Sequence, residues 1–212
     1  MAGTRQGSAR GPEQAGVVRA DAQRNRQRLI EVARRAFGAG EGKVSLEAVA
    51  REAGVGIGTL YRHFPTREAL VEAVYRAERG RLRDAAAQLL AEEQAPDRAL
   101  RAWMDRFADY IAIKGEMAEA LRALIASGVV TQSEAREELS AAVRVILDAG
   151  AATGTLRADA SAEDVVVALV GIFSVCPLPG ERARADRLLD LLMDGLRDGQ
   201  GSQIRWKSPP KV

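Results

Sequence analysis

The stretch AGVGIGTLYRHF, residues 53–64, places three glycines at alternate positions just before a run of polar, basic and aromatic side chains. Such glycines raise the question of a phosphate-binding loop. A dinucleotide fingerprint reads G-x-G-x-x-G after a strand, and a P-loop ends in Gly-Lys-Ser or Gly-Lys-Thr. Here the glycines are Gly54, Gly56 and Gly58, the preceding residues have helical periodicity, and the stretch continues as Gly-Thr-Leu. The spacing therefore argues against both nucleotide-binding loops.

The same residues fit a helix-turn-helix, in which two short helices are joined by a turn that often contains glycine. Ala50 is small where the helices would cross, and Gly54 suits a turn residue with positive φ. Polar side chains between Gly56 and His63 would then face outward, where a recognition helix meets the major groove. A purely structural helical hairpin fits much of the same pattern and stays open. The residues spaced to lock the pair together are Leu46, Val49, Val55 and Leu60.

The composition and charge of the whole chain agree with a helical nucleic-acid-binding protein. The 212 residues are 47% hydrophobic and 28% charged, with few β-branched runs, which predicts an all-α fold. Residues 1–80 carry 14 Lys and Arg against 9 Asp and Glu, whereas the remainder has an acidic excess. A basic first third is expected of a DNA-binding head.

Helix start and stop signals predict about nine helices. The first is expected to begin at Asp21, Ser45 and Thr66 to cap the second and fourth, and Thr131-x-x-Glu134 to form a capping box. The helix after Thr131 is expected to end near Gly150, and Ser161 to open an apolar helix over 162–176. The predicted division is a disordered basic arm (1–20), a helix-turn-helix DNA-binding domain (21–67), a ligand-binding and dimerisation domain (68–198) and a flexible tail (199–212).

Several classes of protein are disfavoured by what the sequence contains. Cys176 is a single cysteine, the first residues have no apolar segment typical of a signal peptide, and the longest uncharged apolar run, Val165–Cys176, has 12 residues. A membrane-spanning helix needs about 20. These features predict a cytoplasmic protein with no membrane partner. His63 has no other ligand at metal-binding spacing, and no nucleophile–base pair stands out, so we expect no metal, no cofactor and no catalytic residue.

The segment SLEAVAREAGVGIGTLYRHFPTREALVEAV, residues 45–74, resembles the DNA-binding head of TetR-family transcriptional regulators. The resemblance extends over about residues 22–75, and beyond them the helical layout and length agree. It implies a three-helix head on a helical-bundle regulatory domain. It also implies a homodimer that binds a palindromic operator in double-stranded DNA and responds to a small-molecule effector.

The resemblance assigns DNA contacts to particular residues. Ser45 would contact a phosphate, Thr59 and Tyr61 would reach phosphate and base edges, and His63 would lie near the backbone at the end of the recognition helix. Arg67 replaces the Lys usual in the family and keeps its positive charge. Base reading would also use Arg62 and contact of Ile57 with thymine methyl groups. Gly56 and Ile57 depart from the family pattern, which often has Ser or Thr and then a polar or basic residue there.

The remainder of the chain is expected to hold an effector pocket and a dimer interface. In the pocket, an inward-facing acid among Asp105, Asp109, Glu116 and Asp148 would favour a cationic lipophile. The pocket candidates are apolar side chains of the middle helices: Trp103, Met104, Phe107, Tyr110, Met117, Leu121, Leu124, Val143, Leu147 and Phe173. The interface candidates come from two late apolar helices: Val166, Leu169, Val170, Phe173, Leu188 and Leu192. Both sets also fit a plain monomer core.

The function predicted from these observations is that of a repressor released from its operator by a small lipophilic ligand such as a drug. A ligand-induced shift of the middle helices would pass through the long fourth helix (66–92) to the DNA-binding heads. Two alternatives keep DNA binding: a regulator without a small-molecule sensor, and an activator. A more distant alternative is a helical small-molecule-binding protein or enzyme whose hairpin is structural.

Overall fold

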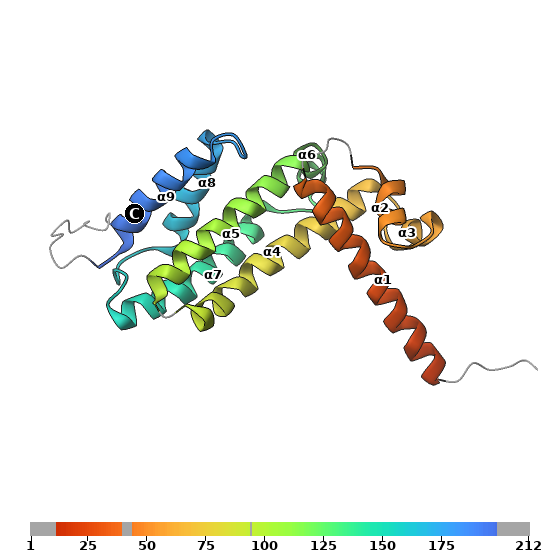
Figure 1. Ribbon diagram of the computed structural model, residues 1–212, viewed down its shortest axis with the longest axis horizontal. Coiled ribbons are helices and arrows are strands. Elements are labelled where there is room, and N and C mark those ends of the chain that lie inside the picture. Colours follow the sequence, from red (N-terminus) through yellow and green to blue (C-terminus); the bar gives the residue numbers. More distant parts are fainter. Residues whose placement is uncertain (1–11, 40–43, 94, 199–212) are drawn as a thin grey trace, which may run out of the picture. The chain divides into compact units, whose positions relative to one another are not determined.

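The computed structural model describes residues 12–39, 44–93 and 95–198, with side chains from Ala20 onward. Over these residues the chain forms helices and no strand, apart from one isolated bridge between Leu156 and Arg197 (Figure 1). The prediction of an all-α fold with about nine helices is confirmed. The helices are α1 (Pro12–Gly38), α2 (Leu46–Glu52), α3 (Ile57–His63), α4 (Arg67–Glu92), α5 (Pro96–Glu116), α6 (Ala118–Ala126), α7 (Gln132–Thr153), α8 (Ala162–Val175) and α9 (Arg182–Leu196).

The chain divides into two compact units. The first holds the chain up to Ala77 together with Ile113–Val130, and the second holds Glu78–Ala112 together with the chain from Thr131 onward. Helix α6 therefore belongs with α1, α2 and α3, and α4 is a continuous helix whose residues are shared between the two units.

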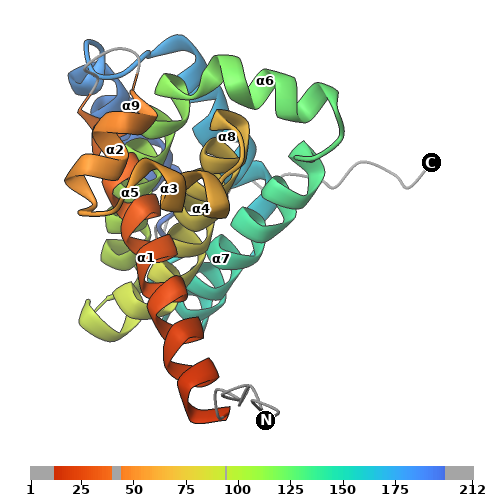
Figure 2. The same ribbon diagram turned by 90° about the vertical axis from the view of Figure 1, so that its right-hand side faces the viewer.

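In the first unit, α1, α2 and α3 pack on one another around a small apolar core (Figure 2). Leu29 of α1, Val49 of α2 and Leu60 of α3 are almost wholly buried, and Phe64 closes the core after α3. Burying a side chain of this size stabilises a fold by about 1.5–3 kcal/mol. Of the four positions predicted to lock the two helices together, Val49 and Leu60 are therefore core residues, whereas Leu46 and Val55 are half-buried.

The first helix begins nine residues earlier than the sequence indicated. It starts at Pro12, not at Asp21. Proline is favoured at the first helical position, because its missing N–H would be unpaired there anyway and its φ is already helical. The expectation took Asp21 as the start of the helix and residues 1–20 as a disordered arm, and so placed the boundary too late. Residues 1–11 of the expected arm, and the expected tail 199–212, lie outside the described residues.

Three predicted N-caps are confirmed. The hydroxyl oxygens of Ser45, Thr66 and Ser161 accept hydrogen bonds from backbone N–H groups three residues later, at 3.3, 3.1 and 3.3 Å. Each such cap satisfies a donor that the first helical turn leaves free, and losing one typically costs about 1 kcal/mol.

Two predictions about α7 are wrong in detail. Thr131 occupies the N-cap position, but its hydroxyl makes no capping hydrogen bond and is buried without a partner, so the capping box does not form. The helix also continues past Gly150 to Thr153, and Gly154 ends it with φ +68°. A glycine stands inside the helix at position 150 because a Cβ there would lie 2.4 Å from Leu156 Cδ1, in the space that the Leu156 side chain fills.

The second unit is built around aromatic side chains of α5. Trp103 and Phe107 are fully buried with ring centroids 5.7 Å apart, and Phe107 lies 5.8 Å from both Tyr110 and Phe173 of α8. The Trp103 indole N–H donates to the Leu82 carbonyl oxygen at 2.8 Å, which satisfies its one polar group. Helix α8 packs against both α7 and α9.

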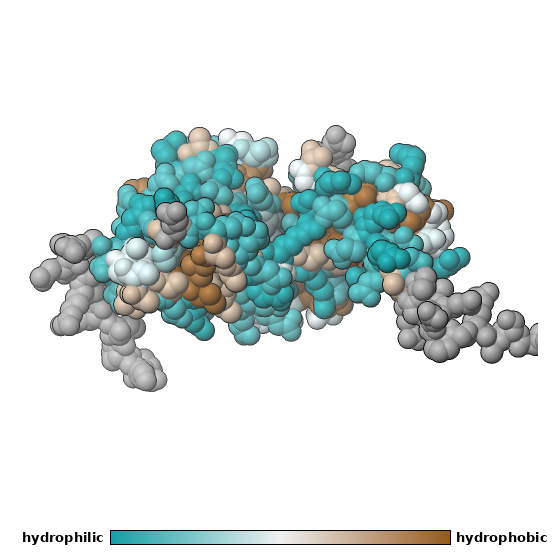
Figure 3. Space-filling view, turned by 60° about the horizontal axis from the view of Figure 1, so that its bottom comes forward, coloured by the Kyte–Doolittle hydropathy of each residue, from teal (hydrophilic) through white to brown (hydrophobic). Residues whose placement is uncertain are grey.

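The face drawn in Figure 3 is mostly hydrophilic, with hydrophobic residues in smaller separate patches. Over the described residues, no helix combines the length and the apolar character that crossing a membrane requires.

Candidate functional site

The turn between α2 and α3 is defined by backbone hydrogen bonds. The N–H of Gly54 donates to the Arg51 carbonyl at 3.1 Å, and the N–H of Val55 donates to the Ala50 carbonyl at 3.0 Å. Gly54 has φ +69°, a conformation that costs other residues about 1–2 kcal/mol. Gly56 precedes α3 in an extended conformation, and its carbonyl accepts from Thr59 N–H at 2.8 Å. The local structure is a helix-turn-helix.

Helix α3 has one buried side and one open side. Leu60 is fully buried, whereas Ile57 and Tyr61 keep 38% and 45% of their surface exposed and Arg62 is exposed as well. Thr59 and His63 are half-buried at the boundary. Three predicted DNA-contacting side chains, Ile57, Tyr61 and Arg62, therefore share the open side with the backbone of Gly58.

Ser45 is exposed at the start of α2 and already has a partner there. Its hydroxyl donates to Glu47 Oε2 at 2.8 Å while its oxygen accepts the capping N–H of Ala48. The hydrogen bond from Ser45 lowers the pKa of Glu47 below its ordinary value. A carboxylate therefore lies beside the residue expected to approach phosphate.

Arg67 is held within the first unit. Its guanidinium donates a hydrogen bond to the Val44 carbonyl oxygen, and its Cζ lies 5.9 Å from the centroid of the Phe37 ring. The side chain thus links the start of α4 to the residue that precedes the N-cap of α2. Any phosphate contact would use a group that also supports the head.

Three arginines of α1 have partners in the first unit. Arg26 lies over the Phe64 ring at 5.2 Å, Arg28 donates to the Ala53 carbonyl at 3.4 Å, and Arg24 pairs with Asp21. Arg26 and Arg28 therefore brace the helix-turn-helix from α1.

Comparison with known proteins identifies this arrangement. A model of bacterial regulatory proteins of the tetR family matches residues 29–74, and a model of the C-terminal domain of SbtR-like transcriptional regulators matches residues 95–198. The crystal structure of the TetR transcriptional regulator SCO0520 from Streptomyces coelicolor is 50% identical. The match covers 81% of this chain and 98% of that one, with a TM-score of 0.72. The chain belongs to the TetR family.

Other relatives support the same assignment. A TetR transcription regulatory protein from Mycobacterium vanbaalenii is 35% identical in its crystal structure, over 85% of this chain and 99% of that one, with a TM-score of 0.66. HTH-type transcriptional regulators of Staphylococcus aureus are 48% identical over 48 residues, and this match spans about a quarter of their length. This TetR-family chain is accordingly a DNA-binding transcriptional regulator.

The ten predicted effector-pocket residues are all buried, and they are divided between the two units. Met117, Leu121 and Leu124 belong to the first unit, and the other seven belong to the second. Met117 lines a cavity together with residues of α1 and α4. In the second unit the rings of Trp103, Phe107, Tyr110 and Phe173 pack against one another as a core.

The four acids considered for the pocket have different surroundings. Asp105 pairs with Arg101 and Arg182 at 2.7 and 2.6 Å, while Asp109 and Asp148 are exposed. Glu116 lines the same cavity as Met117. Within the described ranges, no group of three or more His, Cys, Asp or Glu side chains is arranged to hold a metal ion.

The six predicted interface residues divide between a buried and an open side. Val166, Leu169 and Phe173 point into the core of their own unit, Leu188 and Leu192 are half-buried, and Val170 is 48% exposed. Val167 and Leu191 were not among the predicted interface residues, and they are 51% and 67% exposed. Val167 lies three residues before Val170 and Leu191 three after Leu188, so helical spacing from either could have found them.

Proposed function

We propose that this TetR-family regulator is a repressor that binds a palindromic operator as a homodimer and dissociates from it when a small lipophilic molecule binds. The open side of α3 carries the proposal, because it leaves a large aromatic ring, an aliphatic side chain and a guanidinium exposed together. We retain residues 21–67 as the core of the DNA-binding domain and 68–198 as the regulatory domain. Because the target is operator DNA, we place the protein in the cytoplasm and assign it no catalytic role.

Within the head, each residue has a proposed task. Tyr61, Arg62 and Ile57 reach base edges and thymine methyl groups in the major groove, and Gly56 and Gly58 let the backbone of α3 approach closely. The groups proposed for phosphate or backbone contact are Ser45, Thr59, His63 and Arg67.

The dimer is proposed to form through the open sides of α8 and α9. Val167, Val170 and Leu191 are apolar, exposed and carried by two helices that pack on each other. A second copy would cover them, and a two-fold dimer presents two recognition helices to half-sites about 34–36 Å apart or a multiple of that spacing.

The effector is proposed to enter among the apolar side chains of the second unit, around Trp103, Phe107 and Phe173. Their lining offers few hydrogen-bond partners, which suits a lipophilic molecule. Because α4 runs without a break from the first unit into the second, a shift of its second half can be transmitted to the head. To change the ratio of DNA-binding to released conformation from 99:1 to 1:99, the effector must bind the released conformation about 10⁴-fold more tightly than the DNA-binding one.

The test of DNA recognition is selection from a pool of randomised duplexes, followed by anisotropy titration of the enriched sequence. We expect a palindrome to be enriched, and log–log salt dependence with a slope of about −0.9 per phosphate contacted. Tyr61→Ala and Arg62→Ala should each weaken binding at least tenfold. Arg144→Ala, an exposed position of α7, serves as the charge control. Failure to enrich any sequence would contradict the proposal.

The sign of regulation has its own measurement. Transcription in vitro from a promoter that contains the selected operator should fall when the protein is added and recover when an effector is added. An increase in transcript on adding the protein would identify an activator. If the protein represses transcription and no lipophilic compound restores it, the proposed small-molecule sensor is wrong.

A further inference from the structure

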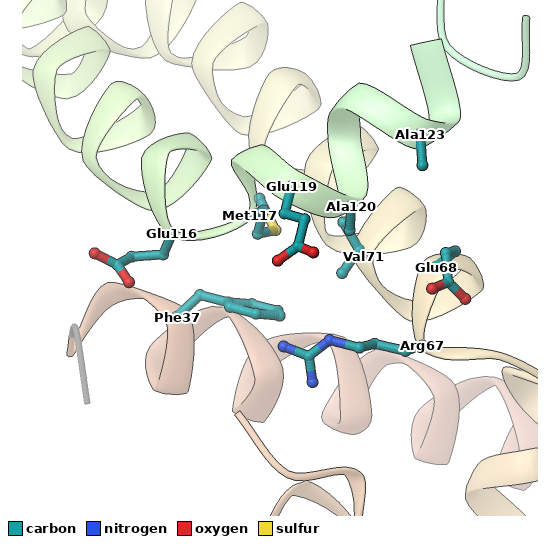
Figure 4. A pocket seen from close by; sticks show the side chains of 9 residues that line it. All are labelled: Phe37, Arg67, Glu68, Val71, Glu116, Met117, Glu119, Ala120 and Ala123. Carbon is teal, nitrogen blue, oxygen red and sulfur yellow. The ribbon is translucent and has the colours of Figure 1, made fainter. Parts of the chain in front are cut away.

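A cavity of about 570 Å³ opens in the first unit between the end of α1, the start of α4, the last residue of α5 and helix α6 (Figure 4). Cavities that bind drug-sized molecules measure about 300–1,000 Å³. Its lining residues are Phe37, Arg67, Glu68, Val71, Glu116, Met117, Glu119, Ala120 and Ala123. It is separate from the aromatic cluster of the second unit.

The inner part of the cavity is apolar. Phe37, Val71 and Met117 are almost wholly buried and present a ring, a branched aliphatic group and a thioether. Ala120 and Ala123 keep the α6 side of the cavity free of bulk. Such a lining favours an apolar ligand body, and a polarisable thioether adapts to different shapes.

The rim of the cavity is acidic. The exposed side chains of Glu68, Glu116 and Glu119 line the cavity together with one cationic side chain, that of Arg67, which leaves an excess of two negative charges. Among the described side chains, those of residues 20–39, 44–93 and 95–198, no cationic group forms an ion pair with these three carboxylates. Figure 4 shows the Glu119 carboxylate directed from α6 toward the Phe37 ring and Arg67. Unpaired carboxylates over an apolar floor attract cations and repel anions.

We propose that this cavity is a binding site for an apolar organic cation. Its charged centre lies between Glu116 and Glu119, and its apolar body contacts Phe37, Val71 and Met117. The size of the cavity accommodates a molecule with several rings, and the excess negative charge determines the sign of the ligand charge.

The same cavity is connected to the DNA-binding face through Arg67, and this part of the inference rests on the proposed function. Arg67 lines the cavity and donates to the Val44 carbonyl, directly before Ser45. A bound cation places a like charge beside Arg67 and competes with its position over Phe37. Occupancy therefore loosens the start of α2 and lowers the affinity for DNA.

The ligand pair that tests charge selectivity is tetraphenylphosphonium and tetraphenylborate, which have nearly the same shape and opposite charge. Methyl-¹³C-methionine labelling gives reporters in the two units, because Met117 lines the cavity while Met104 and Met193 lie in the second unit. We expect the phosphonium ion to shift the Met117 methyl resonance at saturable concentrations and the borate ion not to do so.

The variants locate the site. Glu116→Gln combined with Glu119→Gln should weaken phosphonium binding at least tenfold, and Ala120→Phe, which fills the cavity, should abolish the Met117 shift. Glu137→Gln, an exposed carboxylate of α7, should bind as the wild type does. Equal binding of the borate ion, an unchanged affinity in the double variant, or a shift of Met104 without Met117 would each overturn the cavity site.

Coupling to DNA is measured separately. Saturating phosphonium should weaken binding of the selected operator at least fivefold in the wild type and leave the Glu116→Gln/Glu119→Gln protein unchanged. A Met117 shift with unaltered DNA affinity would overturn the coupling and retain the site. The NMR titration needs no DNA, so a chain that recognises no operator would overturn the proposed function without deciding the cavity.

Discussion

Arg67, the first residue of α4, donates a hydrogen bond to the backbone carbonyl oxygen of Val44, the residue before the N-cap of α2. Since the same guanidinium lies over Phe37, three segments of the head meet at one side chain. Arg67→Lys keeps the charge but loses the planar fork that serves both contacts. We expect a loss of about 1–2 kcal/mol in unfolding free energy, with weaker DNA binding.

Thermal unfolding and operator titration of the same Arg67→Lys sample separate the two effects. Arg122→Lys, at an exposed position of α6, should alter neither. If Arg67→Lys retains full stability and loses only DNA affinity, the contribution of this side chain is confined to phosphate contact.

Glu47 is a carboxylate beside the proposed phosphate contact of Ser45. The Ser45 hydroxyl lowers the pKa of Glu47, so the group stays ionised to a lower pH than an ordinary glutamate. The contribution of the ionised carboxylate to folding stability is lost only as the pH falls through this lowered pKa. At neutral pH the carboxylate repels phosphate, and Glu47→Gln should tighten operator binding two- to fivefold at low salt, with less effect at high salt. Glu134→Gln in α7 is the control, and an unchanged affinity would place Glu47 away from the backbone.

Substitutions at Gly54 and Gly58 test two different reasons for a glycine, the backbone conformation of the turn and the close approach of α3 to DNA. Gly54 has φ +69°, so Gly54→Ala should destabilise the head by about 1–2 kcal/mol. Gly58 is helical and a Cβ at this position would meet open space, so Gly58→Ala should stabilise α3 by up to about 1 kcal/mol. If the backbone of α3 approaches DNA there, the same change weakens operator binding tenfold. Denaturant unfolding and anisotropy distinguish these outcomes, and unaltered binding would exclude close approach at Gly58.

Gly150 should tolerate no side chain. A Cβ at this position would lie 2.4–2.6 Å from three atoms of Leu156, which is itself almost wholly buried. Gly150→Ala therefore forces α7 and the following turn apart, and we expect a loss of about 1–3 kcal/mol. Gly80→Ala in α4 is the matched control, because its Cβ would meet only the end of the Arg83 side chain at 3.9 Å. Equal melting temperatures for the two variants would contradict this packing.

The sequence predicted the head well because local rules determine it. Ser45 and Thr66 cap helices through groups three residues away, and the positive φ of Gly54 follows from its place in the turn between two short amphipathic helices. Gly150 was interpreted as a helix end for the same local reason. The contact with Leu156 that requires a glycine there depends on where the chain returns after Gly154, and hydrophobic periodicity carries no information about that return.

The candidate sites were predicted less completely, because they depend on which side of a helix is open. Apolar character marked α8 as a source of interface residues, but it did not distinguish core positions such as Leu169 from exposed ones such as Val167. Glu119 and Phe37 come from helices far apart in the chain, so their shared cavity has no signature in sequence spacing.

The open sides of α8 and α9 give the prediction for assembly. Val170 and Leu191 are 48% and 67% exposed, and a charge buried without a partner at a subunit interface is strongly unfavourable. Val170→Glu combined with Leu191→Glu should raise the dimer dissociation constant at least a hundredfold while each subunit keeps its helical circular dichroism. Sedimentation equilibrium measures the dissociation constant, and Val129→Glu, an exposed apolar position of the first unit, is the control. Since one head alone binds only half a palindrome, the weaker dimer of the double variant should also bind the operator less tightly. A double variant that remains a dimer would place the interface elsewhere.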